Sequence, residues 1–145
     1  MSDESDAGPA TAFWVIAGFA LVWNLIGLFF YYSQVTMSPD MMASMSQAQR
    51  QFFLDMPTWA TAAQAVAVTA GVLGSLLLLL RKSIAVPLFV LSLVGILVQN
   101  VNSWIVADGL AVFGPGGAVL PAIVVVIAIA LVIYSNSAKA SGLLS

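Results

Sequence analysis

The chain has 145 residues, of which 61% are hydrophobic and 7% are charged, with a formal net charge of −2. Soluble globular domains carry roughly 25% charged residues, so this composition excludes that class. The small net charge also argues against a nucleic-acid partner, which requires a clustered basic face. The chain has no Cys and no His, which excludes disulfides, thiolate nucleophiles and histidine-ligated haem. We expect no cofactor.

Four apolar segments approach or exceed the roughly 20 residues that a helix needs to cross a bilayer. The predicted spans are about 11–32, 59–80, 84–106 and 118–134. They form one membrane domain over residues 11–134, so the predicted fold is all-α, a four-helix transmembrane bundle. The acidic residues 1–10 before it are predicted to be a disordered tail, and residues 135–145 a C-terminal tail.

Between the first and second spans, residues 39–54 are predicted to form an amphipathic helix lying on the membrane surface. Ser38, Pro39 and Asp40 are typical of a helix start, because they supply a capping hydroxyl, a proline at the first position and an acid near the positive end of the helix. Met and Phe residues then recur at roughly helical spacing among polar residues.

Three methionines of this segment, Met41, Met42 and Met45, suggest a second interpretation. Thioethers select Cu(I), so the segment is a candidate copper site. However, an interfacial helix needs an apolar face, which methionines provide well. Without His or Cys to complete a site, copper is the lesser interpretation.

Small residues recur on single faces of the first three spans and predict close helix packing, because they let backbones approach one another. They are Ala20 and Gly27 in the first span, Ala63, Ala67, Gly71 and Gly74 in the second, and Gly95 in the third. The fourth span has no strongly polar residue and is predicted to be the one most exposed to lipid.

Orientation follows from the basic residues near the span ends, because cytoplasmic loops are enriched in Lys and Arg. Arg81 and Lys82, between the second and third spans, are predicted to be cytoplasmic topology anchors. With four spans, this places both termini and Lys139 on the same side and leaves only Arg50 outside. The predicted location is the bacterial inner (cytoplasmic) membrane.

Five side-chain amides then fall in the outer halves of the spans at similar depth: Asn24, Gln64, Gln99, Asn100 and Asn102. Amides in hydrocarbon need hydrogen-bond partners or water. One interpretation is a neutral polar pocket, open to the outside, for a small uncharged solute or water. The other is that the amides bond one another and fix helix register. We favour the second, because amides cannot drive catalysis and pairing accounts for them.

Several local patterns in the first three spans are familiar together. They are Trp23-Asn24 with Gly27, Met56-Pro57 with Trp59, Gly71-Val72-Leu73-Gly74-Ser75-Leu76 leading to Arg81-Lys82, and Ala85 with Ser92-Leu93. This combination resembles a family of small four-helix bacterial inner-membrane proteins loosely labelled "sugar transporter". The resemblance implies solute transport but assigns no binding residues. Many members have an acidic residue shortly after the glycine matching Gly27, where this chain has Leu28-Phe29-Phe30.

The sequence contains no nucleophile–base pair, phosphate loop or metal-ligand spacing, so no enzyme activity is predicted. We expect a protein that acts by binding or packing. The leading prediction is an accessory or structural subunit that contacts the lipid bilayer and either another membrane protein or its own copies. The alternative is a small transporter of neutral polar solutes through an amide-lined pocket, and copper handling is the third.

Overall fold

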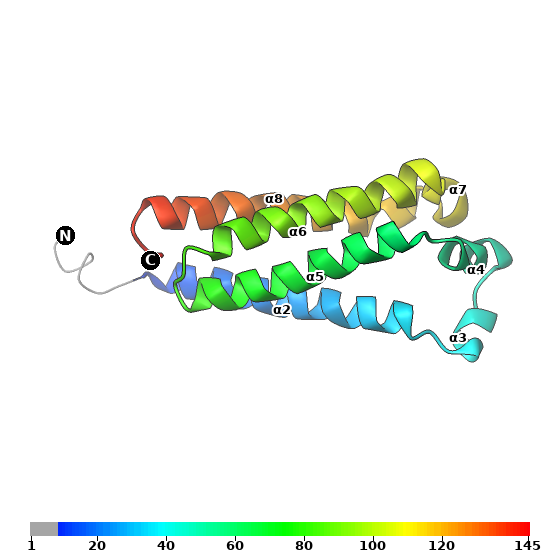
Figure 1. Ribbon diagram of the computed structural model, residues 1–145, viewed down its shortest axis with the longest axis horizontal. Helices are drawn as coiled ribbons and strands as arrows, with labels where there is room; N and C mark the ends of the chain where they lie inside the picture. The colour runs from blue at the N-terminus through cyan, green and yellow to red at the C-terminus, as the bar shows by residue number, and fades with distance from the viewer. Residues whose placement is uncertain (1–8) are drawn as a thin grey trace.

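The computed structural model describes residues 9–145 as an all-α protein built around four long helices (Figure 1). The long helices are α2 (Thr11–Val35), α5 (Thr58–Leu79), α6 (Ala85–Asn100) with its π-helical continuation η1 (Val101–Val106), and α8 (Val119–Ala140). The short elements are α3 (Pro39–Ala43), α4 (Gln47–Leu54), α7 (Gly109–Phe113) and the 3-10 helix η2 (Pro115–Ala118). Residues 1–8, most of the predicted tail over 1–10, lie outside the described residues.

The predicted four-helix transmembrane bundle is confirmed. Four helices are long and apolar enough to cross a membrane, when α6 is counted with η1 and α8 with η2. Short helices lie between the first and second spans, as predicted. The chain is therefore a multi-pass membrane protein whose spans contact the lipid bilayer.

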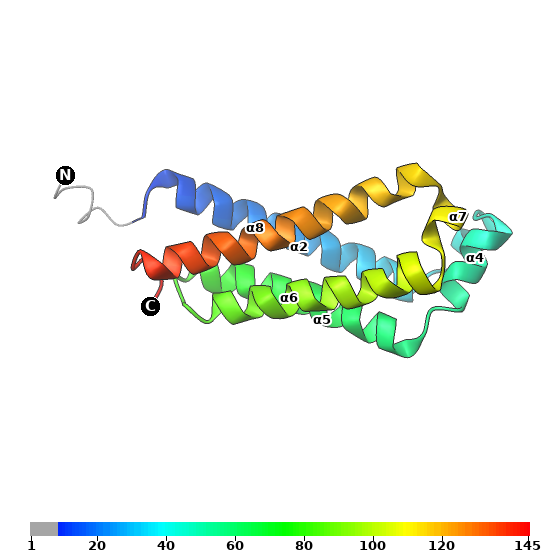
Figure 2. The ribbon, with the colours of Figure 1, turned by 90° about the horizontal axis from the view of Figure 1, so that it is seen from above.

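The spans are arranged in chain order, each packed against the next: α2 on α5, α5 on α6, and α6 on α8. Figures 1 and 2 show the start of α2, the α5–α6 turn and the end of α8 together at one end of the bundle, which we call the Arg81 end. The short helices α3, α4 and α7 gather at the opposite end, the Arg50 end. Helices α2 and α8 make little direct contact, although the rings of Phe13 and Tyr134 have centroids 6.4 Å apart near the Arg81 end.

Helices α5 and α6 share the most extensive helix–helix contact among residues 9–145. A Cβ atom added at Gly95 would lie 2.7 Å from the backbone oxygen of Ala63 and 3.1 Å from the Cβ of Ala67. Ser92 Oγ, one turn away, donates a hydrogen bond of 2.7 Å to the backbone oxygen of Ala67. Small residues thus bring the two backbones close enough for a side chain on α6 to bond the backbone of α5.

The single helix predicted over 39–54 is divided into α3 and α4. The division lies at Ser44-Met45-Ser46. Ser44 Oγ bonds back to the backbone oxygen of Met41 at 2.7 Å, and Ser46 Oγ accepts from the backbone N–H of Gln49 at 3.1 Å. Serine side chains that bond the local backbone offer it an alternative to a continuing helix, and Ser46 is the N-cap of α4. Methionine spacing does not reveal this interruption.

Residues of the predicted C-terminal tail over 135–145 are ordered at the Arg81 end. Helix α8 continues past the predicted span end at 134 to Ala140, and the chain then turns back at Gly142, where φ is +84°. The backbone N–H of Ser145 donates to the backbone oxygen of Arg81 at 2.9 Å, and Arg81 Nε donates to that of Leu143 at 3.0 Å. These hydrogen bonds hold the end of the chain, after α8, against the α5–α6 turn.

Candidate functional site

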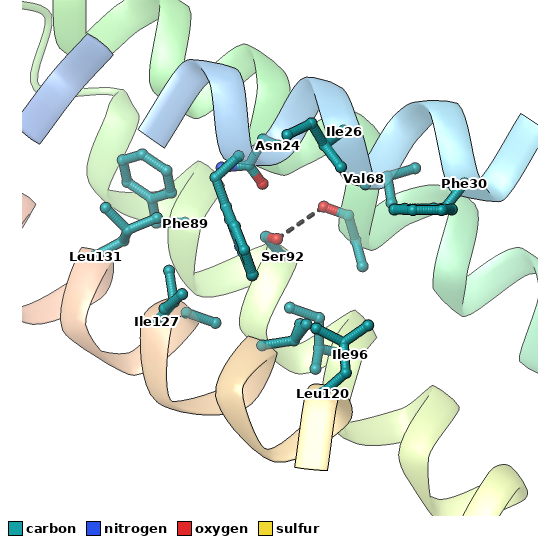
Figure 3. A pocket seen from close by; sticks show the side chains of 15 residues that line it. Asn24, Ile26, Phe30, Val68, Phe89, Ser92, Ile96, Leu120, Ile127 and Leu131 are labelled. Atoms are coloured by element: carbon teal, nitrogen blue, oxygen red, sulfur yellow. Dashed lines mark hydrogen bonds between the residues drawn. The ribbon is translucent and has the colours of Figure 1, made fainter. Parts of the chain in front are cut away.

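A cavity of about 160 Å³ lies in the middle of the bundle, where α2 and α8 face each other across α5 and α6 (Figure 3). We call it the intramembrane cavity. Its lining residues are Trp23, Asn24, Ile26, Gly27 and Phe30 from α2, Ala67 and Val68 from α5, Phe89, Ser92 and Ile96 from α6, and Leu120, Val124, Ile127, Ala128 and Leu131 from α8. All four spans contribute, so the cavity depends on the complete bundle.

The cavity has a buried floor and an exposed mouth. At the floor, Phe89 and Ser92 are 2% and 5% exposed. At the mouth, Ile26 and Phe30 of α2 and Leu120 of α8 are 47%, 60% and 57% exposed. Because these three apolar side chains belong to membrane spans, the mouth lies on a lipid-facing side of the bundle rather than at one of its ends.

Asn24 supplies one of the polar groups of this cavity. Its Nδ2 donates to the backbone oxygen of Ala20 at 2.8 Å and to Ser75 Oγ at 3.2 Å, while Ser75 Oγ donates to the backbone oxygen of Gly71 at 2.8 Å. Both N–H groups of the amide are therefore used. Among residues 9–145, no donor bonds Asn24 Oδ1, which remains a free acceptor.

Gly71 makes this arrangement possible. A Cβ atom at position 71 would collide with Asn24 Oδ1 and would lie 3.3 Å from Ser92 Oγ. Ser92 uses its hydroxyl proton on Ala67, so its oxygen also remains an acceptor. Two acceptors therefore flank the space beside Gly71, on the wall of an otherwise mainly apolar cavity, as Figure 3 shows for Asn24 and Ser92.

The other predicted amides lie in separate settings. Gln64 exchanges hydrogen bonds of 3.3 Å with Gln34, near the Arg50 end of α2. Gln99 Nε2 donates to Ser103 Oγ at 2.8 Å, within its own helix. Asn100 Nδ2 donates to the backbone oxygen of Ile96, and its Oδ1 accepts from Trp104 Nε1, both at 2.8 Å. In the described part of the chain, no hydrogen bond joins two of the five predicted amides.

The fifth amide, Asn102, differs from the others because its Oδ1 is buried without a partner. Only Asn24 lines the intramembrane cavity. Four of the five amides thus have separate partners, Asn102 Oδ1 has none, and the five do not surround one polar pocket.

The small residues predicted for helix packing lie mainly within the bundle. Gly95 packs on Ala63 and Ala67, and Gly74 packs on Phe89. On α2, Ala20 is fully buried, whereas Gly27 makes only an ordinary contact with Val68, at 3.8 Å for an added Cβ. The small-residue face of α5 is therefore already occupied by α6 and α2.

The three methionines and the basic pair Arg81-Lys82 lie at opposite ends of the bundle. Met41 and Met42 belong to α3, and Met45 precedes α4. No group of His, Cys, Asp or Glu side chains suited to a metal ion occurs among residues 9–145. Arg81 and Lys82 form the α5–α6 turn at the other end of the bundle.

The sequence did not single out Gln34, Ser75 or the α8 residues of the cavity. Gln34 could have been recognised, since it is the one Gln near the end of the first span and Gln64 lies in the second turn of the next span. Ser75 lies one turn after Gly71 on the same helix face, and this spacing can be recognised in the sequence. The contribution of Val124 and Ala128 leaves no polar signal, because an apolar wall resembles a lipid-facing surface.

No known family model matches the chain, and neither a curated protein nor a solved structure shows significant similarity to it. The resemblance to the four-helix family therefore stays a prediction.

Proposed function

We propose that this chain is a non-enzymatic binding protein of the bacterial inner membrane, and that its intramembrane cavity holds an apolar, membrane-soluble molecule bearing a hydroxyl group. One observation carries the proposal: an apolar mouth open to lipid leads to a buried wall with two free acceptors, Asn24 Oδ1 and Ser92 Oγ. Acceptors without donors select a hydroxyl over an ether or ester, because only the hydroxyl can donate.

The size of the cavity limits what enters it. Apolar cavities of roughly 150 Å³ stay dry and bind a ring the size of benzene. The intramembrane cavity, at about 160 Å³, therefore accommodates one ring or a short chain segment. A larger ligand leaves its remaining part in the bilayer, between Phe30 and Leu120 at the mouth.

Photoaffinity labelling of the purified full chain in lipid nanodiscs tests this function. The probe is a long-chain alcohol with a diazirine near its hydroxyl, used beside its methyl ether. We expect labelling of peptides from α2 and α8, with the alcohol preferred roughly fivefold, as one neutral hydrogen bond implies.

Ala128→Phe, which fills the cavity, is expected to abolish this labelling. Ala130→Phe is the matched control, because Ala130 is on the exposed face of the same helix. Labelling spread evenly over all four spans, or unaffected by Ala128→Phe, contradicts the proposal. Equal labelling by alcohol and ether contradicts the role of the two acceptors.

The other functions predicted from sequence have less support. An accessory subunit needs a small-residue face free for a partner, whereas Gly71, Gly74 and Gly95 are used within the bundle. Transport of a neutral polar solute needs amides gathered along one path, and these amides have separate partners. We therefore place ligand binding ahead of both.

We also propose that both termini are cytoplasmic. Support comes from the gathering of Arg81, Lys82 and Lys139 at one end of the bundle, with Arg50 at the other. The chain contains no Cys, so single substitutions Lys82→Cys and Arg50→Cys provide clean labelling sites. In intact cells, an impermeant maleimide is expected to label position 50 and not position 82, and the reverse result contradicts this orientation.

A further inference from the structure

A second cavity lies at the Arg50 end, separate from the intramembrane cavity. It has a volume of about 640 Å³, is open on one side, and is lined by α4, the start of α5, η1 and the residues that follow η1 up to α7. Its lining residues are Ala48, Gln51, Phe52, Asp55, Met56, Pro57, Trp59, Asn102, Val106, Ala107 and Val112. We call it the end cavity. None of these residues lines the intramembrane cavity.

Asn102 is the unusual residue of the end cavity. Its side chain is 1% exposed, and its Oδ1 is buried with no hydrogen-bond partner. It is therefore the one buried side-chain oxygen or nitrogen without a partner among residues 9–145. Burying such a group without a hydrogen bond costs about 1–3 kcal/mol, so this oxygen lowers the stability of the folded protein.

The backbone presents Asn102 in an equally uncommon way. The residue lies in the π-helical turn η1, where the backbone N–H of Ala107 donates to the backbone oxygen of Asn102 at 2.7 Å. Single π-turns within helices are often found at functional sites, because they redirect side chains out of the regular helical pattern. Asn102 and the π-turn thus form one wall of the end cavity, with the Oδ1 atom itself buried behind that wall.

The charge of the end cavity is negative. Asp55 is the one charged residue among those that line it, and its Oδ1 accepts a hydrogen bond of 2.7 Å from Gln51 Nε2. The nearby Arg50 is turned away, because its guanidinium donates to the backbone oxygens of Met42 and Met45. No basic residue lines the cavity, which disfavours an anionic ligand.

Aromatic faces complete the lining. Phe52 packs edge-to-face on Phe113 of α7, with ring centroids 5.0 Å apart, which holds α4 over the cavity. Trp59, 47% exposed, lies in the first turn of α5 at the rim. Aromatic rings attract cations through their faces, and a carboxylate beside them adds to this preference.

We propose that the end cavity is a second binding site, for the ammonium group of an amine-bearing ligand. The ammonium group donates to the exposed carboxylate of Asp55 and lies against Trp59. The same chemistry is offered by an ethanolamine lipid headgroup and by a free amine from solution. The site is independent of the function proposed for the intramembrane cavity.

Lipid retention in nanodiscs tests the site with the full chain. The nanodiscs contain equal amounts of phosphatidylethanolamine and phosphatidylglycerol, and native mass spectrometry reports which lipid stays bound. We expect the ethanolamine lipid to be enriched. Asp55→Asn is expected to lower this enrichment roughly tenfold, as the loss of a charge-assisted hydrogen bond implies. Asp40→Asn, a carboxylate on α3 outside the end cavity, is the matched control.

The comparison of Asp55→Asn with Asp40→Asn decides the outcome. Ala128→Phe, in the intramembrane cavity, is expected to leave the enrichment unchanged, which separates the two sites. Enrichment of phosphatidylglycerol, or enrichment that survives Asp55→Asn, overturns the proposal.

A calorimetric titration with ethanolamine distinguishes the two sources of amine. Binding of free ethanolamine that Asp55→Asn abolishes, without lipid enrichment, assigns the site to a soluble amine and supports the proposal. If neither the lipid nor the free amine binds, the end cavity is not an ammonium site.

Discussion

The contact between α5 and α6 and the gap between α2 and α8 are two opposite solutions to helix packing in one bundle. At Gly95, the absence of a side chain lets α6 approach the backbone of α5, and Ser92 completes the contact with a hydrogen bond to Ala67. Between α2 and α8, the facing side chains include Ile26, Phe30 and Leu120, which leave a cavity.

The difference follows from side-chain size and shape. Lipid tails are as apolar as the helices, so spans associate through close packing and hydrogen bonds rather than through the hydrophobic effect. On α5 and α6, Gly and Ala residues permit both the close packing and the hydrogen bond between the helices. Helix α8 offers mainly Val, Ile and Leu on the side that faces α2, so it keeps its distance. The loosely packed side of the bundle is thus the one available to a ligand.

The largest expected effect is from Gly95→Val, which places branched carbon atoms against the backbone of α5. A Cβ there already lies 2.7 Å from the oxygen of Ala63, and a backbone atom cannot move aside. We expect the free energy of unfolding to fall by about 3 kcal/mol, the upper part of the range for overpacked cores. Denaturant-induced unfolding in detergent micelles measures it.

Gly18→Val is the matched control, because a Cβ at Gly18 meets nothing within 4 Å. It is expected to change stability by less than about 0.5 kcal/mol, as at other uncrowded surface positions. Equal stability of both variants would show that the α5–α6 contact is not the tightest part of the bundle.

Gly71→Ala is expected to have the next largest effect. The new methyl group displaces the Asn24 side chain, which breaks its bond to Ser75 and costs about 1–2 kcal/mol. Probe labelling of the intramembrane cavity should fall at the same time. Gly18→Ala is the control, because an added Cβ at Gly18 meets nothing within 4 Å and Gly18 does not line the cavity.

A double-mutant cycle sharpens this prediction. In an Asn24→Ala background, Gly71→Ala has no amide to displace and is expected to be close to neutral. The coupling energy between positions 24 and 71 therefore measures the collision alone. If Gly71→Ala is equally costly with and without the Asn24 amide, the collision is not the cause.

Ser92→Ala removes the hydrogen bond from α6 to α5 and one of the two cavity acceptors. We expect a loss of about 1 kcal/mol in stability, typical of one neutral hydrogen bond. The preference of the cavity for the alcohol probe over its ether should also decrease. Ser135→Ala is the control, because Ser135 is equally buried but bonds only its own helix, to the backbone oxygen of Val132. A probe preference that Ser92→Ala leaves intact excludes Ser92 as a ligand acceptor.

The coarse features of the fold were predictable because they depend on composition summed over many residues. Each span is an apolar segment of about 20 residues, and the basic pair at Arg81 and Lys82 marks a turn between two of them. The break between α3 and α4 was not predicted, since it depends on whether Ser44 and Ser46 bond the local backbone.

The two cavities could not be predicted, because they depend on which polar atoms lack hydrogen-bond partners and which spaces stay empty after the helices pack. The sequence places Asn24 in a span, but it does not reveal that Ala20 and Ser75 use both of its N–H groups. Similarly, the sequence shows that Asn102 is an amide within a span. It does not show that the residue lies in a π-helical turn with its Oδ1 buried, because a shift in backbone hydrogen bonding leaves no pattern in the side chains.

The smallest expected effect concerns the turn after α8, through which the end of the chain bonds the α5–α6 turn at the Arg81 end. Gly142 has a φ of +84° with open space around its Cα, so Gly142→Ala costs only the backbone strain, about 1 kcal/mol. Gly116→Ala is the control, because the space is equally open but the backbone angle is ordinary. Since α8 packs mainly on α6, weakening its terminal turn should loosen the α2–α8 side more than the α5–α6 side. We therefore expect faster hydrogen exchange in α8 of Gly142→Ala, with exchange in α5 unchanged. Equal acceleration in both helices would mean that the two sides of the bundle unfold as one unit.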